Sequence, residues 1–214
     1  MRFTLSSSEL NTQLQILSKV INSKNSISIL ECFFFEAAEG KITITASDSE
    51  TLLTSTINIE DNDIEGRFAI PSRTILDAMR ELPEQPLTFD IDTLDYSVKV
   101  LYQNGMYSFN ALNADEYPQV QPISEGACVI TLDANVLSSN ISRSLFATAQ
   151  DELRPVMNGI YFDLTPESLA IVASDGHKLV RNRNYSVKSD TPATFILQKK
   201  PATLLKTVLS KETG

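Results

Sequence analysis

The sequence is poor in residues on which many enzymes and secreted domains depend. It has no Trp, a single His and only two cysteines, Cys32 and Cys128. Two cysteines do not indicate a disulfide framework or a zinc site, and we expect both to be reduced, partly buried thiols. The N-terminus lacks the apolar core of a signal peptide, and no apolar run approaches the roughly 18 residues of a membrane span. We therefore expect a cytoplasmic protein with no membrane partner.

The motifs of common catalytic sites are missing as well. The sequence has no glycine-rich phosphate loop, no Ser/His/Asp order with its usual turn and no Cys/His metal spacing. His177 beside Asp175 is a weak acid–base candidate, because adjacent residues on a turn seldom face each other. These absences favour a protein with no catalytic residues, no metal and no cofactor.

What the sequence does contain is an internal repeat. Ala173–Leu179 (ASDGHKL) has a twin at Ala46–Leu52 (ASDSETL), and the offset between the two is 127 residues. The same offset, without a gap, pairs Leu10 with Leu137, Phe35 with Phe162, Ile44 with Ile171, Phe68 with Phe195 and Leu82 with Leu209. Such a period indicates tandem related units, and the apolar character of the matches indicates that a core is preserved. We predict one domain over residues 1–125 and a second, C-terminally incomplete copy over residues 126–214.

Apolar periodicity predicts the same plan twice within the first domain, namely a strand, a helix and three strands. Ser6 and Glu9 have the spacing of a capping box, and Pro83 ends the second helix. The expected strands cover 2–5, 27–36, 42–46, 52–59, 68–70, 87–91, 96–101 and 107–112, the helices run from about 7 to 22 and from 72 to 82, and 113–125 is a linker.

The second domain is expected to repeat this plan with Asp133 as a helix N-cap. Its predicted strands cover 129–132, 159–164, 169–173, 179–185 and 194–197, and its helices carry Leu137, Ile141 and Leu145 and span about 201–210. Helices that alternate with groups of antiparallel strands indicate an α+β fold.

Basic residues are concentrated in the predicted helices, and acidic residues are concentrated in the rest of the chain. The net charge is −9, yet four helix windows (7–25, 72–82, 134–147 and 199–211) hold nine basic and three acidic residues. If the helices share one side of the sheets, that side is a positive surface backed by a negative one. Such a surface attracts a phosphate backbone without reading its sequence. The alternative is a set of ordinary solvated helix faces.

Asp48 and Asp175 occupy the same place in the repeated turn. Together with Glu50 they could bind a divalent metal through oxygen ligands. The alternative, which we prefer, is that each aspartate caps its own turn through hydrogen bonds from the side chain to the backbone.

Several stretches resemble the bacterial DNA polymerase III beta subunit, the sliding clamp family. They are Met1–Thr4, Ala46–Glu50, Asn113–Pro118, Ala147–Gly159 and Val172–Leu179. The resemblance covers all 214 residues. It implies tandem clamp domains with helices on the inner face and sheets on the outer face of a ring. In the family three such domains make one chain and two chains close the ring, so we expect the third domain to be absent here.

The resemblance also implies a function without catalysis. A clamp of this family encircles duplex DNA as a homodimer and tethers the DNA polymerase III alpha subunit, the clamp loader, other polymerases and repair proteins. The DNA-facing positions that carry over are Lys24, Arg73, Arg80, Gln150 and Lys200, and Tyr107 and Phe109 lie on the dimer edge. The half of the peptide pocket supplied by the second domain matches Arg154, Met157, Ser174, Gly176, His177, Lys178 and Leu179. Ser174 and Lys178 stand where the family usually has Thr and Arg.

Two other function classes stay open on the sequence. One is a metal-dependent nucleic-acid enzyme that uses Asp48, Glu50 and Asp175. The other is a two-domain binding protein with neither a basic helix face nor a peptide site.

Overall fold

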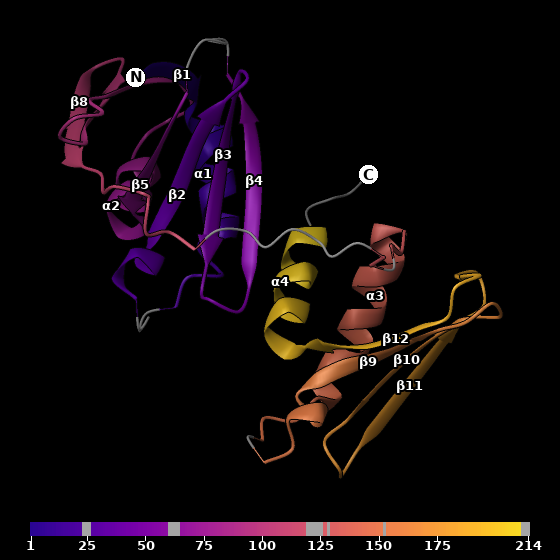
Figure 1. Cartoon of the computed structure of the whole chain (residues 1–214). Coiled ribbons are helices and arrows are strands. Elements are labelled where there is room, and N and C mark those ends of the chain that lie inside the picture. The colour runs from indigo at the N-terminus through magenta and orange to yellow at the C-terminus, as the bar shows by residue number, and fades with distance from the viewer. Residues whose placement is uncertain (23–26, 60–64, 119–125, 128, 152, 211–214) are drawn as a thin grey trace. The chain divides into compact units, whose positions relative to one another are not determined.

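The computed structural model describes residues 1–22, 27–59, 65–118, 126–127, 129–151 and 153–210. The chain divides into two compact units, Met1–Gln121 and Pro122–Gly214, each with its own sheets and helices (Figure 1). All strand pairs in both units are antiparallel, and the predicted α+β class is confirmed. Lys24 and Cys128, named in the sequence analysis, lie outside the described residues.

The first unit has the predicted plan of a strand, a helix and three strands, used twice. Its elements are β1 (Arg2–Ser6), α1 (Ser7–Leu17), a 3-10 turn (Ser28–Glu31), β2 (Cys32–Ala38), β3 (Lys41–Ser47), β4 (Leu52–Asn58), β5 (Gly66–Pro71), α2 (Ser72–Arg80), β6 (Pro86–Ile91), β7 (Ser97–Tyr102) and β8 (Gly105–Asn110). The two halves exchange their first strands. Strand β1 joins the sheet β1-β6-β7-β8. Strand β5 joins the sheet β4-β3-β2-β5 (Figure 1).

Each exchanged strand is fixed by a pair of phenylalanines. Phe3 on β1 stacks on Phe89 of β6, with ring centroids 5.1 Å apart, and Phe35 on β2 stacks on Phe68 of β5 at the same separation. All four side chains are buried. Stacked aromatic pairs contribute about 0.5–1.5 kcal/mol beyond the area they bury. The exchange therefore ties the two halves of the unit into one core.

Helix α1 begins as the sequence predicts but ends earlier. The Ser6 hydroxyl accepts from the Glu9 N–H at 3.4 Å, and Leu10, Leu14 and Leu17 are buried on one face. The predicted continuation to residue 22 is wrong. The Val20 N–H donates to the Leu17 carbonyl at 3.0 Å, a bond of the tighter 3-10 type, and the helix has ended. Branching at Cβ lowers helix propensity, and two branched residues follow at this point.

The start of the second predicted strand is also wrong. Ile29 and Leu30 are both buried and lie in a 3-10 turn rather than in a strand. The Leu30 N–H donates to the Ile27 carbonyl at 3.1 Å, a bond between residues three apart that an extended strand cannot make. Strand β2 begins at Cys32 instead.

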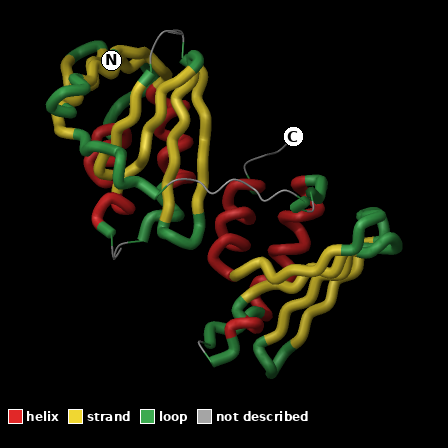
Figure 2. The backbone as a smooth tube through the Cα atoms, viewed as in Figure 1, coloured by secondary structure: helices red, strands yellow, loops and turns green. Residues whose placement is uncertain are grey.

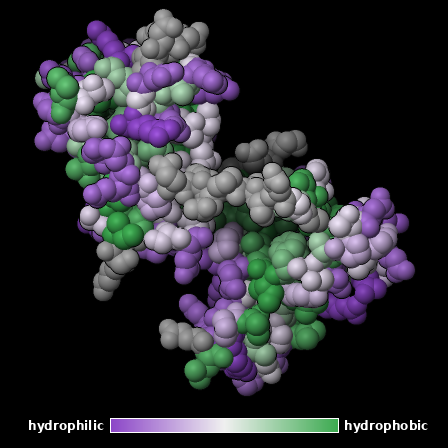
Figure 3. Space-filling model, in the orientation of Figure 1, coloured by the Kyte–Doolittle hydropathy of each residue, from purple (hydrophilic) through white to green (hydrophobic). Residues whose placement is uncertain are grey.

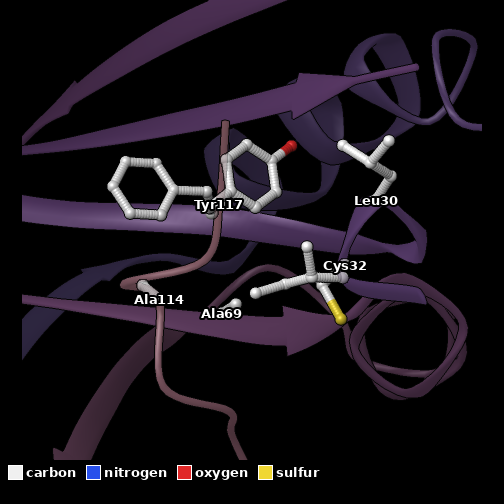
Figure 4. Packing of buried hydrophobic residues seen from close by; sticks show 7 residues of the cluster. Leu30, Cys32, Ala69, Ala114 and Tyr117 are labelled. Carbon is white, nitrogen blue, oxygen red and sulfur yellow. The ribbon is translucent and has the colours of Figure 1, made fainter. Parts of the chain in front are cut away.

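The segment predicted as a linker is described as far as residue 118. This part covers the outer face of the sheet β4-β3-β2-β5. Tyr117 stacks on Phe34 with centroids 5.0 Å apart, and its hydroxyl donates to the Thr45 carbonyl at 3.4 Å. Ala114 and Tyr117 point onto the strands that carry Cys32 and Ala69 (Figure 4). Burial raises the pKa of the Tyr117 phenol. Ala111, Ala114 and Tyr117 are therefore part of the core, so this segment is not a free connection.

The second unit contains one four-stranded sheet, ordered β11-β10-β9-β12. Its elements are α3 (Ala134–Ser144), two 3-10 turns (Leu145–Ala147 and Pro155–Met157), β9 (Gly159–Leu164), β10 (Leu169–Ser174), β11 (Leu179–Asn184), β12 (Ala193–Gln198) and α4 (Lys199–Leu209). Helices α3 and α4 lie side by side over one face of this sheet (Figures 1 and 2). Asp133 caps α3 as predicted and accepts from the N–H groups of Asn135 and Val136.

The sheet order β11-β10-β9-β12 repeats the order β4-β3-β2-β5 of the first unit. The strand predicted over 129–132 does not form, and Val129 is exposed. Its equivalent in the first unit, β1, pairs only with β6, which starts at Pro86. The repeat offset of 127 places that position at residue 213, outside the described residues. In the described part of the chain no strand lies beside residues 129–132, and a strand needs a neighbour to pair its backbone groups.

Candidate functional site

The repeated turn has one design in both units. The Asp48 Oδ1 accepts from the N–H groups of Glu50 and Thr51 at 3.0 and 2.6 Å. In the second unit, the Asp175 Oδ1 accepts from His177 and Lys178 at 3.0 and 2.9 Å. The hydrogen bonds confirm that each aspartate caps its own turn. Within the described residues, no three His, Cys, Asp or Glu side chains are grouped as ligands for a metal.

The turn of the second unit contains an ion pair between two of its own residues. In the second unit the Lys178 ammonium pairs with the Asp175 carboxylate, which lies at the same turn. This bond, followed by the bonds from the two backbone N–H groups, holds the pKa of Asp175 well below its ordinary value. Asp175 is therefore ionised and fully engaged, and its hydrogen bonds leave it poorly suited to act as a base for His177.

A second loop, residues 151–158, lies against this turn. A Cβ placed on Gly176 would come within 3.1 Å of the Arg154 Nη1, so the glycine makes room for the guanidinium. Gly176 also has φ +90, a backbone conformation that favours glycine. The structure thus brings Arg154 against the turn that holds Ser174, Gly176, His177 and Lys178, and all five residues were predicted for the pocket half.

The loop that carries Arg154 is held by Asn158. The Asn158 side chain accepts from the Asp151 N–H and donates to the Asp151 carbonyl, both at 2.9 Å. The Arg154 Nε donates to the Asp151 Oδ2 at 2.7 Å, and this bond is the largest cause of the lowered pKa of Asp151. Nothing in the sequence analysis singled out Asn158. The sequence feature that could have identified Asn158 is its amide side chain at the junction of loop and strand. An amide can accept from one backbone group and donate to another.

The loop 151–158 and the strand after the turn also carry exposed apolar side chains. Leu153, Val156 and Leu179 are 92%, 66% and 67% exposed, and Met157 is half-buried. Leu153 and Val156 could have been identified from the sequence, because they are apolar residues in a polar loop. The Ser174 hydroxyl donates to the Lys178 carbonyl and accepts from the Gly176 N–H, so it fixes the turn that carries the other predicted pocket residues. A surface of this kind suits a ligand with apolar side chains and a negative charge.

Of the predicted DNA-facing residues that the structure describes, Arg73, Arg80 and Lys200 lie in the end turns of helices, and Gln150 follows a 3-10 turn. Arg73 is in the first turn of α2 and Arg80 in its last, where it approaches the Asp77 Oδ1 at 3.8 Å. Lys200 is in the first turn of α4, and Gln150 is exposed after the 3-10 turn that follows α3. Helix α1 packs on α2, and α3 packs on α4. Each unit therefore presents a helix pair that carries exposed or half-buried cations.

Tyr107 and Phe109 lie on β8, the end strand of its sheet. They pair across the ladder with Val100 and Val98 and are half-buried on the core side, and Tyr107 also contacts Tyr102 with ring centroids 5.2 Å apart. The other edge of β8 has no strand beside it in the described part of the chain. An edge of this kind can pair with another chain.

Two family models match the chain. The model of the DNA polymerase III beta subunit, N-terminal domain, matches residues 1–121, and the model of the central domain of the same subunit matches residues 131–214. Together they cover both compact units. The two matches leave only residues 122–130 unassigned.

Individual proteins give the same result. The beta sliding clamp of Bacillus subtilis is 25% identical over 217 residues, which is 98% of this chain and 57% of the relative. The crystal structure of the DNA polymerase III beta subunit of Thermotoga maritima has a TM-score of 0.85 at 27% identity and covers all of this chain and 57% of that one. The same subunit of Pseudomonas aeruginosa has a TM-score of 0.91 at 23% identity, with 58% of that chain covered, and shows the fold alone. The chain spans about half the length of the curated relatives it matches.

Proposed function

The chain belongs to the DNA polymerase III beta subunit family, the sliding clamps, and on that premise we propose that it forms part of a ring that encircles duplex DNA and keeps a polymerase on its template. The observation that carries the proposal is the match of both units to domains of this subunit. The role requires no bond to be made or broken, so we propose a processivity factor and not an enzyme. Processivity then comes from topology, because a closed ring cannot leave DNA sideways.

The helix side of each unit is the proposed DNA-facing surface. Arg73, Arg80 and Lys200 stand at ends of α2 and α4, with Gln150 near the end of α3. Charges of this kind attract phosphates through solvent and carry no base readout, which is what sliding requires. Duplex DNA of any sequence is therefore the proposed partner.

Reversal of these charges tests the surface. We expect Arg73→Glu with Lys200→Glu to weaken binding of a labelled duplex and to reduce the slope of log K against log salt by roughly 2, since each lost phosphate contact contributes about 0.9. Lys41→Glu is the matched control, because Lys41 is exposed on a strand on the opposite side of its sheet from the buried Ile42. Equal slopes for all three proteins would exclude the helix-side assignment.

The junction of loop 151–158 with the turn at Gly176 is the proposed half of a peptide site. Exposed Leu179 and half-buried Met157 offer apolar contacts beside Arg154, His177 and Lys178. We propose that short linear segments of the polymerase, the clamp loader and repair proteins dock here. Gly176→Val should abolish such binding in the full-length protein, because the new side chain would meet the Arg154 guanidinium and strain the backbone.

The edge strand β8 is the proposed assembly surface. Tyr107 and Phe109 leave part of their rings exposed there, and the strand edge is open in the described part of the chain. We propose that in the full-length protein this edge pairs with a second chain and closes a homodimeric ring. Light scattering should give a dimer mass for the full-length protein and a monomer mass for its Phe109→Lys variant. A dimer mass for both would refute the assignment.

A further inference from the structure

The first helical residue in each half of the first unit is a buried serine. Ser7 begins α1 and Ser72 begins α2, and their exposed fractions are 2% and 7%. The Ser7 hydroxyl donates to the Pro83 carbonyl and accepts from the Gln85 N–H, both at 2.9 Å. The chain that follows α2 therefore satisfies the serine at the start of α1.

In the described part of the chain, the hydroxyl of Ser72 has no such partner. By the symmetry of the two halves, the chain that follows α1 would supply it. Ser18, Ile21 and Asn22 of that segment instead line a recess of about 250 Å³, together with Ser72. A buried hydroxyl without a hydrogen bond costs stability, so it marks a place where a ligand can supply the missing partner.

Burial is what makes Ser72 informative. Strongly hydrophilic side chains are spread over the face of the first unit that the space-filling view shows, so exposed polar groups alone do not mark a site (Figure 3). The recess is also smaller than the pockets of about 300–1,000 Å³ that take drug-sized ligands. Its size suits a small polar group.

The N-terminal end of α2 opens into the same recess. Pro71 and Ser72 both line it, Pro71 occupies the N-cap position, and no described side chain caps the helix. The first N–H groups of a helix have no acceptor within that helix. Together with the helix dipole they favour an anion, and a phosphate is the anion that proteins most often bind in this way.

The charges of the lining favour an anion with one negative charge. Arg73 and Glu31 are the charged residues there, and both are exposed. Within the described residues neither is in an ion pair. The two side-chain charges cancel, and the N-terminus of α2 adds about half a positive charge. A phosphodiester carries one negative charge and fits this balance better than a doubly charged phosphate monoester.

The equivalent positions of the second unit carry other groups. The repeat offset of 127 relates Ser72 to Lys199 and Ser18 to Leu145, so both hydroxyls are replaced. The Lys199 N–H donates to the Asn158 carbonyl at 2.9 Å, so the first N–H of α4 is already bonded. The recess at Ser72 is therefore a feature of the first unit and not of the repeat.

We propose that the Ser72 hydroxyl, the first N–H groups of α2 and the Arg73 guanidinium bind one phosphate group. One phosphate oxygen accepts from the hydroxyl and the backbone, and another accepts from Arg73. The inference rests on the proposed function, because the phosphodiester of duplex DNA is the source that the charge balance favours. It adds to that function a direct contact from an uncharged side chain, which salt does not screen.

Titration with inorganic phosphate tests the recess without DNA. At constant ionic strength, we expect the amide NMR signals of Ser72, Arg73 and Thr74 to shift saturably at millimolar phosphate. Ser72→Ala should weaken this binding about threefold or more, the usual effect of losing one hydrogen bond. Thr74→Ala is the matched control, because Thr74 is exposed in the same helical turn and lies outside the recess lining.

Thermal unfolding separates a ligand site from a structural role. Because the Ser72 hydroxyl has no partner in the described residues, Ser72→Ala should not lower the unfolding midpoint in phosphate-free buffer. A clear fall of the midpoint would mean that the hydroxyl stabilises the protein itself. That result would overturn the proposal.

A labelled DNA duplex tests the source of the phosphate. We expect the duplex to shift the same amide signals. Ser72→Ala should lower its affinity and leave the slope of log K against log salt unchanged, because no charge is lost. Arg73→Gln should lower the affinity and reduce the slope by about 0.9, the contribution of one phosphate contact.

The remaining outcomes are distinct. Absence of shifts at Ser72–Thr74 with both probes, or equal phosphate binding by the protein and Ser72→Ala, would overturn the proposal. If Ser72→Ala weakens phosphate binding but not duplex binding, the recess takes a free phosphate compound and DNA is excluded as its source. If phosphate binds in the recess and no duplex binds the protein, the proposed function fails and the phosphate site stands.

Discussion

Phe162 and Phe195 stack across β9 and β12 with ring centroids 4.9 Å apart, in the geometry that Phe35 and Phe68 adopt across β2 and β5 at 5.1 Å. Each pair is directly opposed in its strand register. Both pairs are therefore the same structural contact, repeated at an offset of 127 residues. The environments differ, because Phe195 is 42% exposed and Phe68 is 1% exposed.

This difference predicts unequal effects of truncating the two rings of one pair. Phe162→Ala should lower the free energy of unfolding of the second unit by about 3–5 kcal/mol, the usual result of emptying a buried aromatic site. Phe195→Ala should lower it clearly less, since its ring keeps much of its contact with water in the folded state. Urea unfolding followed by resolved NMR signals of β10 measures both values. Equal losses for the two variants would contradict the packing described here.

The repeated turn predicts opposite effects of exchanging its glycine and serine. Ser49 has φ +80 at the position equivalent to Gly176, which has φ +90. A side chain at positive φ costs about 1–2 kcal/mol. Ser49→Gly should therefore stabilise the first unit by about 0.5–1 kcal/mol, whereas Gly176→Ser should destabilise the second unit by at least that amount. Thermal unfolding of the two variants measures the effects, and a loss of stability in Ser49→Gly would contradict the strain argument.

The ion pair of the Gly176 turn predicts a pH dependence. The pKa of Asp175 lies below its ordinary value of 3.8, mainly because of the bond from Lys178. A lowered carboxyl pKa stabilises the turn at pH values above the ordinary pKa, and this stabilisation is lost as the pH falls through the lowered value. In Lys178→Met we expect the midpoint to move up toward 3.8 and to stay below it, since two backbone N–H groups still donate to Asp175. Carboxyl carbon NMR titration reads this midpoint, and an unchanged midpoint would disprove the role of Lys178.

The side chain of Asn158 is expected to hold the loop that carries Arg154 in place. Its side chain makes two bonds to the backbone of Asp151. Asn158→Ala leaves both groups without these partners and should cost about 1–3 kcal/mol. Hydrogen exchange at residues 153–157 should become faster, whereas Asn135→Ala, at an exposed helix position, should leave it unchanged. Unaltered exchange in the Asn158 variant would mean that the loop is held by other contacts.

Much of the fold was predictable from the sequence because the repeat and the apolar periodicity act locally. Patterns within a few residues predict the helix caps at Ser6 and Asp133. They also predict that each half consists of a strand, a helix and three strands. Two expectations failed where contacts between distant residues decide the structure. No described strand lies beside residues 129–132, and Ala114 and Tyr117 belong to the core because Tyr117 stacks on Phe34.

The candidate site was predictable in part for the same reason. The aspartate caps of the turn are local, and their bonds are those expected from the residue types. The contact between Gly176 and Arg154 joins residues from different loops and is not encoded in any short pattern. The domain limits at residues 125 and 126, the DNA-facing residues and the dimer edge stay predictions.

Side-specific crosslinking to DNA tests the central claim most directly. In a background of Cys32→Ser and Cys128→Ser, Arg73→Cys or Lys200→Cys reports from the helix side and Lys41→Cys from the opposite side of its sheet. Each single cysteine carries a photoactivated crosslinker. We predict crosslinks to duplex DNA from the first two positions only, at equal yield on two unrelated sequences and decreasing steeply with salt. Equal yields from all three positions, or a yield that depends on the sequence of the duplex, would contradict a clamp that slides on DNA by its helix side.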